Sequence, residues 1–183
     1  MTGLVPPHSR GGRPRVWWIA AIALIAIVAV LFTTYGLRSP APAGDAGTLF
    51  GISLPDPKGN SQPFAQWRGK VLVVNFWATW CAPCREEMPM FVKAQADHGA
   101  RGLQFVGIAV DEAEKVARFV EEIGLNYPAL IGGYGAMELS KTLGNTVMAL
   151  PFTVVLDRVG RITLTHLGPL SQSQLDRVLK QTL

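Results

Sequence analysis

The sequence predicts an α/β domain with a mixed central sheet flanked by helices, preceded by one transmembrane helix. Three observations favour this arrangement. The stretch 16–37 contains no charged side chain, which is typical of a membrane span. Beyond residue 48, short apolar runs typical of buried strands alternate with amphipathic, helix-like segments. One of the apolar runs leads directly into the only two cysteines of the chain, which are spaced C-x-x-C.

We divide the chain into four regions. They are a cytoplasmic N-terminal tail at 1–15, a transmembrane signal anchor at 16–37, a flexible tether at 38–47 and a folded domain at 48–183. A helix over 16–37 would be long enough to cross a hydrocarbon core of about 30 Å. Arginines are concentrated before this span, and such a bias keeps the preceding tail in the cytoplasm. The folded domain is therefore expected on the extracytoplasmic, or periplasmic, side of the membrane.

A cleavable signal peptide is the alternative for the N-terminal region. Ala41-Pro42-Ala43 has the small-x-small pattern of a cleavage site. We favour the uncleaved anchor because the apolar stretch is longer than the roughly 7–15 residues of a secretory signal. Either interpretation exports the folded domain to an oxidising compartment, where a pair of cysteines can form a disulfide.

The net charge of +4 comes from the N-terminal region. Every Asp and Glu lies after residue 44, and beyond that point they are balanced by as many Lys and Arg. The folded domain therefore has no excess of basic residues for binding a polyanion. We expect no nucleic-acid partner.

The apolar pattern also predicts the elements of the folded domain. An uncharged run at 103–110 indicates a buried parallel strand, and apolar residues at helical spacing, ended by Gly124, indicate a helix at 116–123. A turn at 157–160 separates two apolar runs, as in a hairpin. Pro89 lies inside an expected helix and should kink it. The expected strands are 49–54, 71–77, 103–110, 127–131, 152–156 and 162–166, and the expected helices are 83–98, 116–123, 136–143 and one around 175–179.

The two cysteines have the position that a reactive thiol requires. Cys81 falls where the strand at 71–77 gives way to a helix, so it lies at the helix N-terminus. Unpaired N–H groups and the helix dipole stabilise a thiolate there and lower the thiol pKa. Cys84 follows about one turn later and can close a small-ring disulfide, with Pro83 tolerated in the first turn. We expect Cys81 to attack a disulfide and Cys84 to resolve the mixed disulfide.

A static disulfide and half of a zinc site are the alternatives for this pair. A structural disulfide that closes so short a loop would stabilise the chain little. A zinc site normally needs four ligands, and the three histidines show no suitable spacing. We therefore expect a redox-active pair, and neither a metal nor a cofactor.

The segment VLVVNFWATWCAPCREEMP at 71–89 resembles the TlpA- and ResA-like thioredoxin-like proteins. These are membrane-anchored, exported thiol–disulfide oxidoreductases related to the cytochrome c maturation protein CcmG, or DsbE. Further motifs match in the same order, namely RGK at 68–70, GIAVD at 107–111 and LPFT at 150–153. The resemblance covers 48–183 and implies a thioredoxin-like fold.

The resemblance also implies a surface that binds substrates. Pro151 would be a cis-proline that faces the disulfide and leaves the Leu150 backbone free to pair with an extended substrate. The alternative for Pro151 is an ordinary proline at the start of a strand. We expect Trp80 and Pro83 to shape the same surface, and Trp77 to belong either to it or to the core.

Asn75 sets this chain apart from thioredoxins proper, whereas Glu87 matches a residue of the ResA-like proteins. Thioredoxins have a buried aspartate at the position of Asn75, and an asparagine cannot take up a proton in its place. In ResA-like proteins a glutamate three residues after the second cysteine is tied to the site, and Glu87 matches it. Burial beside the sulfurs would raise its pKa and suit it to catalytic proton transfer near neutral pH. The alternative is a solvated glutamate like Glu86.

These residues predict a membrane-tethered thiol–disulfide oxidoreductase. The resemblance implies that it reduces disulfides in exported apoproteins, such as apocytochrome c or copper-site proteins. It also implies that a membrane electron donor of the CcdA or DsbD kind recharges the cysteines, and a tether would hold the domain near that donor. A Cu(I) metallochaperone that uses the same two cysteines is the alternative function, and a peroxidase is a further one.

Overall fold

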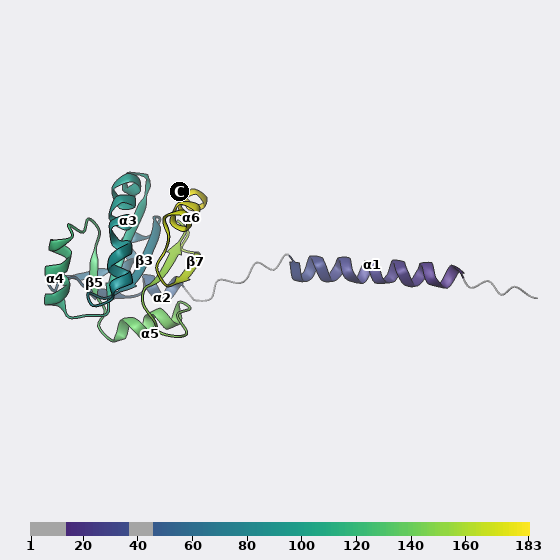
Figure 1. Cartoon of the computed structure of the whole chain (residues 1–183), viewed down its shortest axis with the longest axis horizontal. Coiled ribbons are helices and arrows are strands. Elements are labelled where there is room, and N and C mark those ends of the chain that lie inside the picture. Colours follow the sequence, from purple (N-terminus) through teal and green to yellow (C-terminus); the bar gives the residue numbers. More distant parts are fainter. Residues whose placement is uncertain (1–13, 37–45) are drawn as a thin grey trace, which may run out of the picture. The chain divides into compact units, whose positions relative to one another are not determined.

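The computed structural model describes residues 14–36 and 46–183 of the chain. Within the first of these ranges, side chains are described for 17–28. Contacts divide the chain into two units, Met1–Ala41 and Pro42–Leu183 (Figure 1).

The first unit contains the helix α1 (Pro14–Gly36). Its described side chains are apolar and exposed, among them Trp17 and Trp18. In the part of the chain that the structure describes, no helix is long and apolar enough to cross a membrane. The predicted transmembrane helix at 16–37 is therefore not confirmed, and the predicted tail and tether lie almost entirely outside the described residues.

The second unit is built on a five-stranded sheet. Its strands are β3 (Val71–Trp77), β4 (Leu103–Ala109), β5 (Ala129–Ile131), β6 (Phe152–Leu156) and β7 (Ile162–Leu167). They lie in the order β5-β4-β3-β6-β7. β3 pairs in parallel with β4, and β4 with β5, whereas β6 is antiparallel to both β3 and β7. The predicted mixed sheet is thus confirmed, with the strand that precedes the cysteines at its centre.

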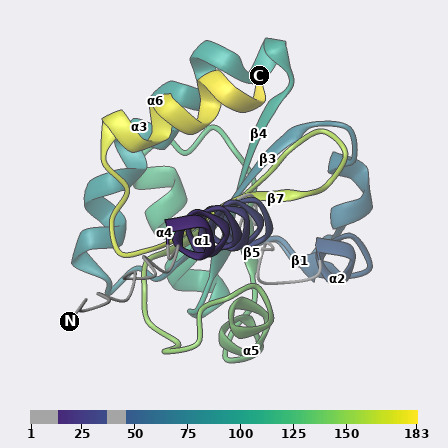
Figure 2. The same cartoon turned by 90° about the vertical axis from the view of Figure 1, so that its right-hand side faces the viewer.

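Helices cover both faces of this sheet (Figure 2). They are α3 (Ala82–His98), α4 (Ala113–Glu122), α5 (Gly135–Thr142) and α6 (Gln172–Thr182). Because side chains alternate along a strand, Val71 and Val73 of β3 pack under α3 and α6, whereas Leu72 and Val74 pack on the face covered by α5. Trp77, at the end of β3, packs against α4. Every residue of β3 is buried for this reason.

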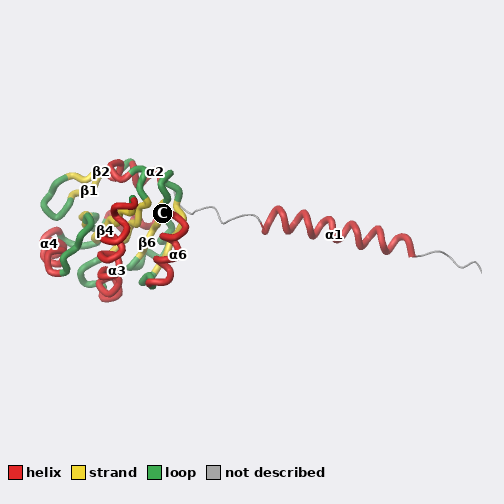
Figure 3. Tube along the Cα trace, turned by 90° about the horizontal axis from the view of Figure 1, so that it is seen from above, coloured by secondary structure: helices red, strands yellow, loops and turns green. Residues whose placement is uncertain are grey.

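The segment before β3 differs from the prediction (Figure 3). The predicted strand at 49–54 is wrong, because α2 (Ala46–Phe50) is a short helix and the strand begins later, as β1 (Ser53–Pro55). Leu49 and Phe50 are consecutive and both buried, whereas a half-buried strand would bury every second residue. Two adjacent apolar residues therefore fit a helix that packs on the core better than they fit an edge strand.

The other predicted elements agree with the structure to within a few residues. α3 runs through Pro89 as one helix. Gly124 has a φ of 61° just after α4, a backbone conformation that favours glycine. The sequence pattern does not predict three short elements, namely β2 (Ser61–Pro63), which pairs antiparallel with β1, and the 3₁₀ helices η1 (Phe64–Trp67) and η2 (Gly99–Arg101).

Candidate active site

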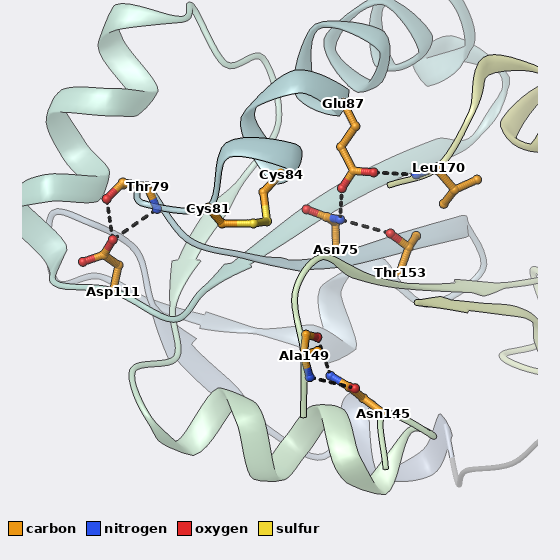
Figure 4. The surroundings of a disulfide bond; sticks show 10 residues. All are labelled: Asn75, Thr79, Cys81, Cys84, Glu87, Asp111, Asn145, Ala149, Thr153 and Leu170. Carbon is orange, nitrogen blue, oxygen red and sulfur yellow. Dashed lines mark hydrogen bonds between the residues drawn. A yellow bond between two sulfur atoms is a disulfide. The ribbon is translucent and has the colours of Figure 1, made fainter. Parts of the chain in front are cut away.

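A disulfide joins Cys81 and Cys84 where β3 leads into α3 (Figure 4). Cys81 is the N-cap residue of α3, and Cys84 lies in its first turn. Cys81 is 6% exposed, whereas Cys84 has no exposed surface. An incoming sulfur can therefore approach Cys81 and not Cys84. This difference fits the predicted roles of an attacking and a resolving cysteine.

The start of α3 provides the electrostatic environment for a reactive Cys81. Among the described residues, no side chain caps this end of the helix, so its first backbone N–H groups are free to interact with a sulfur anion. The first turn contains no acidic residue, and it contains Pro83 at a position where a missing N–H costs nothing. After reduction, these N–H groups and the helix dipole would stabilise a Cys81 thiolate.

Asp111 fixes the loop that carries Trp80 and Cys81. Its Oδ2 atom accepts hydrogen bonds from the backbone N–H of Thr79, at 3.1 Å, and from the Thr79 hydroxyl. Its Oδ1 atom accepts one from the backbone N–H of Glu112 at 2.8 Å. Burial raises the pKa of Asp111, but these hydrogen bonds outweigh it and leave the pKa below its ordinary value. Asp111 is thus a charged anchor that ties the segment after β4 to the loop after β3.

Glu87 lies on the buried face of α3, one turn beyond the disulfide (Figure 4). It is 4% exposed, whereas Glu86 is exposed to solvent. Its Oε1 accepts a hydrogen bond from Asn75 Nδ2 and its Oε2 accepts one from the Leu170 backbone N–H, both at 2.8 Å. Asn75 Nδ2 also donates to Thr153 Oγ1 at 3.0 Å. Burial raises the pKa of Glu87 to about 7, against the lowering effect of its two hydrogen bonds.

The polar groups around Glu87 are not all paired. The Oδ1 atom of Asn75 is buried and has no hydrogen-bond partner among the described residues, and the same is true of the Tyr127 hydroxyl. Burial, and next the charge of Glu87, raise the pKa of Tyr127, so this hydroxyl stays protonated. No described hydrogen bond joins Glu87 to either sulfur. The interior side of the disulfide therefore has unused hydrogen-bonding groups near a carboxyl whose pKa is close to neutral.

The residues predicted to bind a substrate differ in exposure. The Leu150–Pro151 peptide bond is cis, as the resemblance implies. Leu150 is partly buried and packs against the apolar cluster that contains both cysteines. Trp80 is 69% exposed and Pro83 is partly exposed, so both are accessible to a substrate. Their part in binding stays a prediction.

Trp77 belongs to the core. Its side chain has no exposed surface, and its ring lies 5.5 Å from that of Phe119 on α4, measured between centroids. A Cβ atom at Gly107 would lie 2.7 Å from Trp77 Nε1, so only a glycine leaves room for this indole. Trp77 is therefore close to the cysteines but closed to a substrate.

Two groups of residues near the disulfide received no role from the sequence pattern. One lines a surface pocket of about 570 Å³ beside Trp80, and it includes Asp111 and Tyr134. The GIAVD motif ends in Asp111 and offered a signal for it, although not for its bond to Thr79. The other is the loop that precedes Leu150, where the buried Asn145 bonds to Ala149. No feature of the sequence marks Asn145.

Comparison with known proteins identifies the family. The model of the Redoxin family matches residues 39–179. The chain belongs to the Redoxin family. The thiol-disulfide oxidoreductase ResA of Halalkalibacterium halodurans is 29% identical to it over 173 residues, which are 92% of this chain and 95% of that protein. The thioredoxin-like protein YneN of Bacillus subtilis is 31% identical over 171 residues, covering 88% of this chain and 96% of that protein.

Solved structures agree with this assignment. The chain is similar to a thiol:disulfide interchange protein of the thioredoxin family from Chlorobium tepidum, with a TM-score of 0.67 and 29% identity over 79% of this chain and 97% of that one. The predicted thioredoxin-like fold is confirmed. This Redoxin protein is TlpA/ResA-like, and it is a thiol–disulfide oxidoreductase.

Proposed function

We propose that this Redoxin protein is an exported, membrane-tethered reductant of disulfides in other exported proteins. The observation that supports this best is the unequal access to its cysteine pair, since Cys81 at the helix N-terminus keeps 6% of its surface exposed and Cys84 is fully buried. Such an arrangement suits a nucleophile that meets a protein substrate and a second thiol that only reacts internally.

The proposed reaction transfers two electrons from the cysteine pair to the substrate. The Cys81 thiolate attacks one sulfur of the substrate disulfide, forms a mixed disulfide and releases the other substrate sulfur as a thiolate, which takes up a proton. The Cys84 thiol then loses its proton, and its sulfur attacks Cys81. This step forms the Cys81–Cys84 disulfide and releases the second substrate thiol. The substrate is reduced, and the protein is left in the oxidised form.

The substrates, the electron donor and the location are proposed from the sequence. The resemblance to ResA- and CcmG-like proteins favours apocytochrome c or copper-site proteins as substrates and a donor of the CcdA or DsbD kind. The uncharged stretch 16–37, with arginines before it, favours a signal anchor that places the folded domain on the extracytoplasmic side. A tether of this kind raises the effective concentration of the domain near a membrane donor.

The reduction potential of the full chain tests the proposed direction of electron flow. The chain is equilibrated in dithiothreitol or glutathione buffers, and its tryptophan fluorescence reports the redox state, since the buried Trp77 lies in the same apolar cluster as the cysteines. We expect a value near that of thioredoxin, about −270 mV, which would suit a reductant. A value near that of DsbA, about −120 mV, would mean that the protein is an oxidant and would overturn the proposal.

A further inference from the structure

Asn145 closes the loop that leads from α5 to Leu150 and Pro151. It is 1% exposed. Its Nδ2 donates a hydrogen bond to the Ala149 carbonyl at 2.9 Å, and its Oδ1 accepts one from the Ala149 backbone N–H at 3.1 Å (Figure 4). One buried side chain thus pairs with both polar groups of the Ala149 backbone.

The two bonds to Ala149 fix the orientation of the Asn145 amide, and this orientation allows one further contact. Its Nδ2 also donates to Ser140 Oγ at 3.1 Å, and the fully buried Ser140 donates to the Met137 carbonyl at 2.8 Å. If the amide were turned over, its oxygen would face the Ala149 carbonyl and its nitrogen would face the Ala149 N–H. Both pairs would repel, so the observed orientation is the one that gives both Ala149 backbone groups a hydrogen-bond partner.

Burial does not hold the tip of this loop. Val147 is 66% exposed and Met148 is 37% exposed. Met148 also has a φ of 53°, which a residue other than glycine adopts only where neighbouring contacts require it. Together with the hydrogen bond from the Met148 backbone N–H to the Asn145 carbonyl at 3.0 Å, the two bonds between Asn145 and Ala149 bring the ends of the loop together, and they are the ones that reach the residue next to Leu150.

Leu150, which follows Ala149, is the residue of this loop that lies against the cysteines. Leu150 packs against the apolar cluster that contains both cysteines. Within the described part of the chain, no hydrogen bond uses the backbone N–H or carbonyl of Leu150. Unpaired backbone groups beside a disulfide can pair with an extended peptide. Because Leu150 is joined directly to Ala149, the position of Ala149 determines where these groups point.

We propose that Asn145 is a positioning residue for substrate binding, which holds Ala149 so that the Leu150 backbone pairs with the peptide chain next to the substrate disulfide. This inference rests on the proposed reduction of protein disulfides. A small disulfide without a peptide chain cannot use such pairing. Loss of Asn145 should therefore slow the reaction with a protein disulfide and spare the reaction with a small one.

The substitution Asn145→Ala tests this proposal in the full chain. The protein is reduced and freed of reductant, and the second-order rate constant of its oxidation is measured with insulin and with the small disulfide DTNB. We expect the rate constant for insulin to fall about tenfold, the effect of losing roughly one well-placed hydrogen bond, while that for DTNB stays near the wild-type value. Thermal unfolding shows whether the variant is folded.

Ser140→Ala is the matched control. It removes a buried hydrogen bond from the same cluster but leaves both bonds between Asn145 and Ala149, so it should keep the wild-type ratio of the two rate constants. Asn145→Asp provides a second variant where the alanine variant does not fold. Its carboxylate can accept from the Ala149 N–H, but its other oxygen would face the Ala149 carbonyl and repel it, so its ratio should fall as that of Asn145→Ala does.

Each result decides for or against the proposal. An unchanged ratio in a folded Asn145 variant would overturn it, as would an equal loss with both disulfides, which would indicate general damage to the site. A fall in Ser140→Ala as large as that in Asn145→Ala would also overturn it. If the wild type reacts with DTNB and not with insulin, the proposed reduction of protein disulfides fails together with this inference. If the wild type reduces insulin and the ratio is unchanged, this inference fails alone.

Discussion

Two carboxylates near the disulfide have opposite electrostatic behaviour. Glu87 lies on its interior side and Asp111 on its outer side, and each accepts hydrogen bonds from both side-chain and backbone donors (Figure 4). Glu87 is 4% exposed and its pKa is raised to about 7. Asp111 is only half-buried and its pKa is below the ordinary value.

The balance between burial and the hydrogen bonds to each carboxylate accounts for this difference in pKa. For both groups burial is the largest single influence on the pKa, and it favours the neutral form. At Asp111 the hydrogen bonds outweigh it, whereas at Glu87 they do not. The interior carboxyl can therefore exchange a proton at neutral pH, while the outer one stays charged and anchors the loop of Cys81. Substitutions of Glu87 and of Asp111 should therefore differ most clearly in how their effects on stability and rate depend on pH.

The largest expected effect is on the stability of the oxidised protein. The pKa of Glu87 is raised from 4.5 to about 7 on folding, so the unfolded chain loses this proton at a lower pH than the folded chain. The stabilising contribution of the neutral carboxyl is present in full below pH 4.5 and is lost as the pH rises to about 7. Relative to Glu87→Gln, the free energy of unfolding in urea should fall by roughly 3 kcal/mol between these limits. Parallel pH profiles for the two proteins would contradict this prediction.

A smaller effect is expected on the step in which Cys84 resolves the mixed disulfide. A Glu87 carboxylate can accept the proton of the Cys84 thiol, so the rate of this step should rise as the pH passes about 7. Glu87→Gln should remove this inflection and slow the step at least about tenfold above it. Stopped-flow measurement of the release of the second substrate thiol, from pH 5 to about 9, would record both changes.

Asp111→Asn is the matched change on the outer side, and Glu86→Gln is the matched change at an exposed glutamate. The first should slow the reaction by a few-fold, because it weakens the bonds to Thr79, and should leave the inflection near pH 7 in place. Glu86→Gln should change neither the reaction rate nor the inflection near pH 7. If Asp111→Asn moved the inflection as much as Glu87→Gln, the distinction between the two sides of the disulfide would be wrong.

The sequence predicted the reacting residues of this site better than the hydrogen bonds that hold the site in place. The C-x-x-C spacing after an apolar run predicted a disulfide at a helix N-terminus, because these features are local. The resemblance to ResA-like proteins pointed to Glu87, but not to its partner Leu170, which lies 83 positions away in the chain. Asp111 and Thr79 are 32 positions apart, and only the parallel pairing of β3 with β4 brings them together.

Local pattern also failed where packing decides the outcome. Residues 46–50 form a helix because two consecutive apolar side chains are both buried against the core. Asn145 looks like any polar loop residue in the sequence, and its importance comes from its burial and from the direction of its amide. Trp77 and Trp80 are both aromatic residues of the same motif, yet one is a core residue and the other is exposed.

Capture of the mixed disulfide tests the central claim most directly, namely that Cys81 attacks the substrate and Cys84 resolves the product. A peptide with an oxidised C-x-x-C-H sequence, the haem attachment motif of c-type cytochromes, is mixed with reduced full-length protein. With Cys84→Ser, we expect a covalent adduct through Cys81, detected by mass spectrometry without reductant. With Cys81→Ser, we expect none. An adduct that forms through Cys84 in Cys81→Ser, and not through Cys81 in Cys84→Ser, would contradict the account.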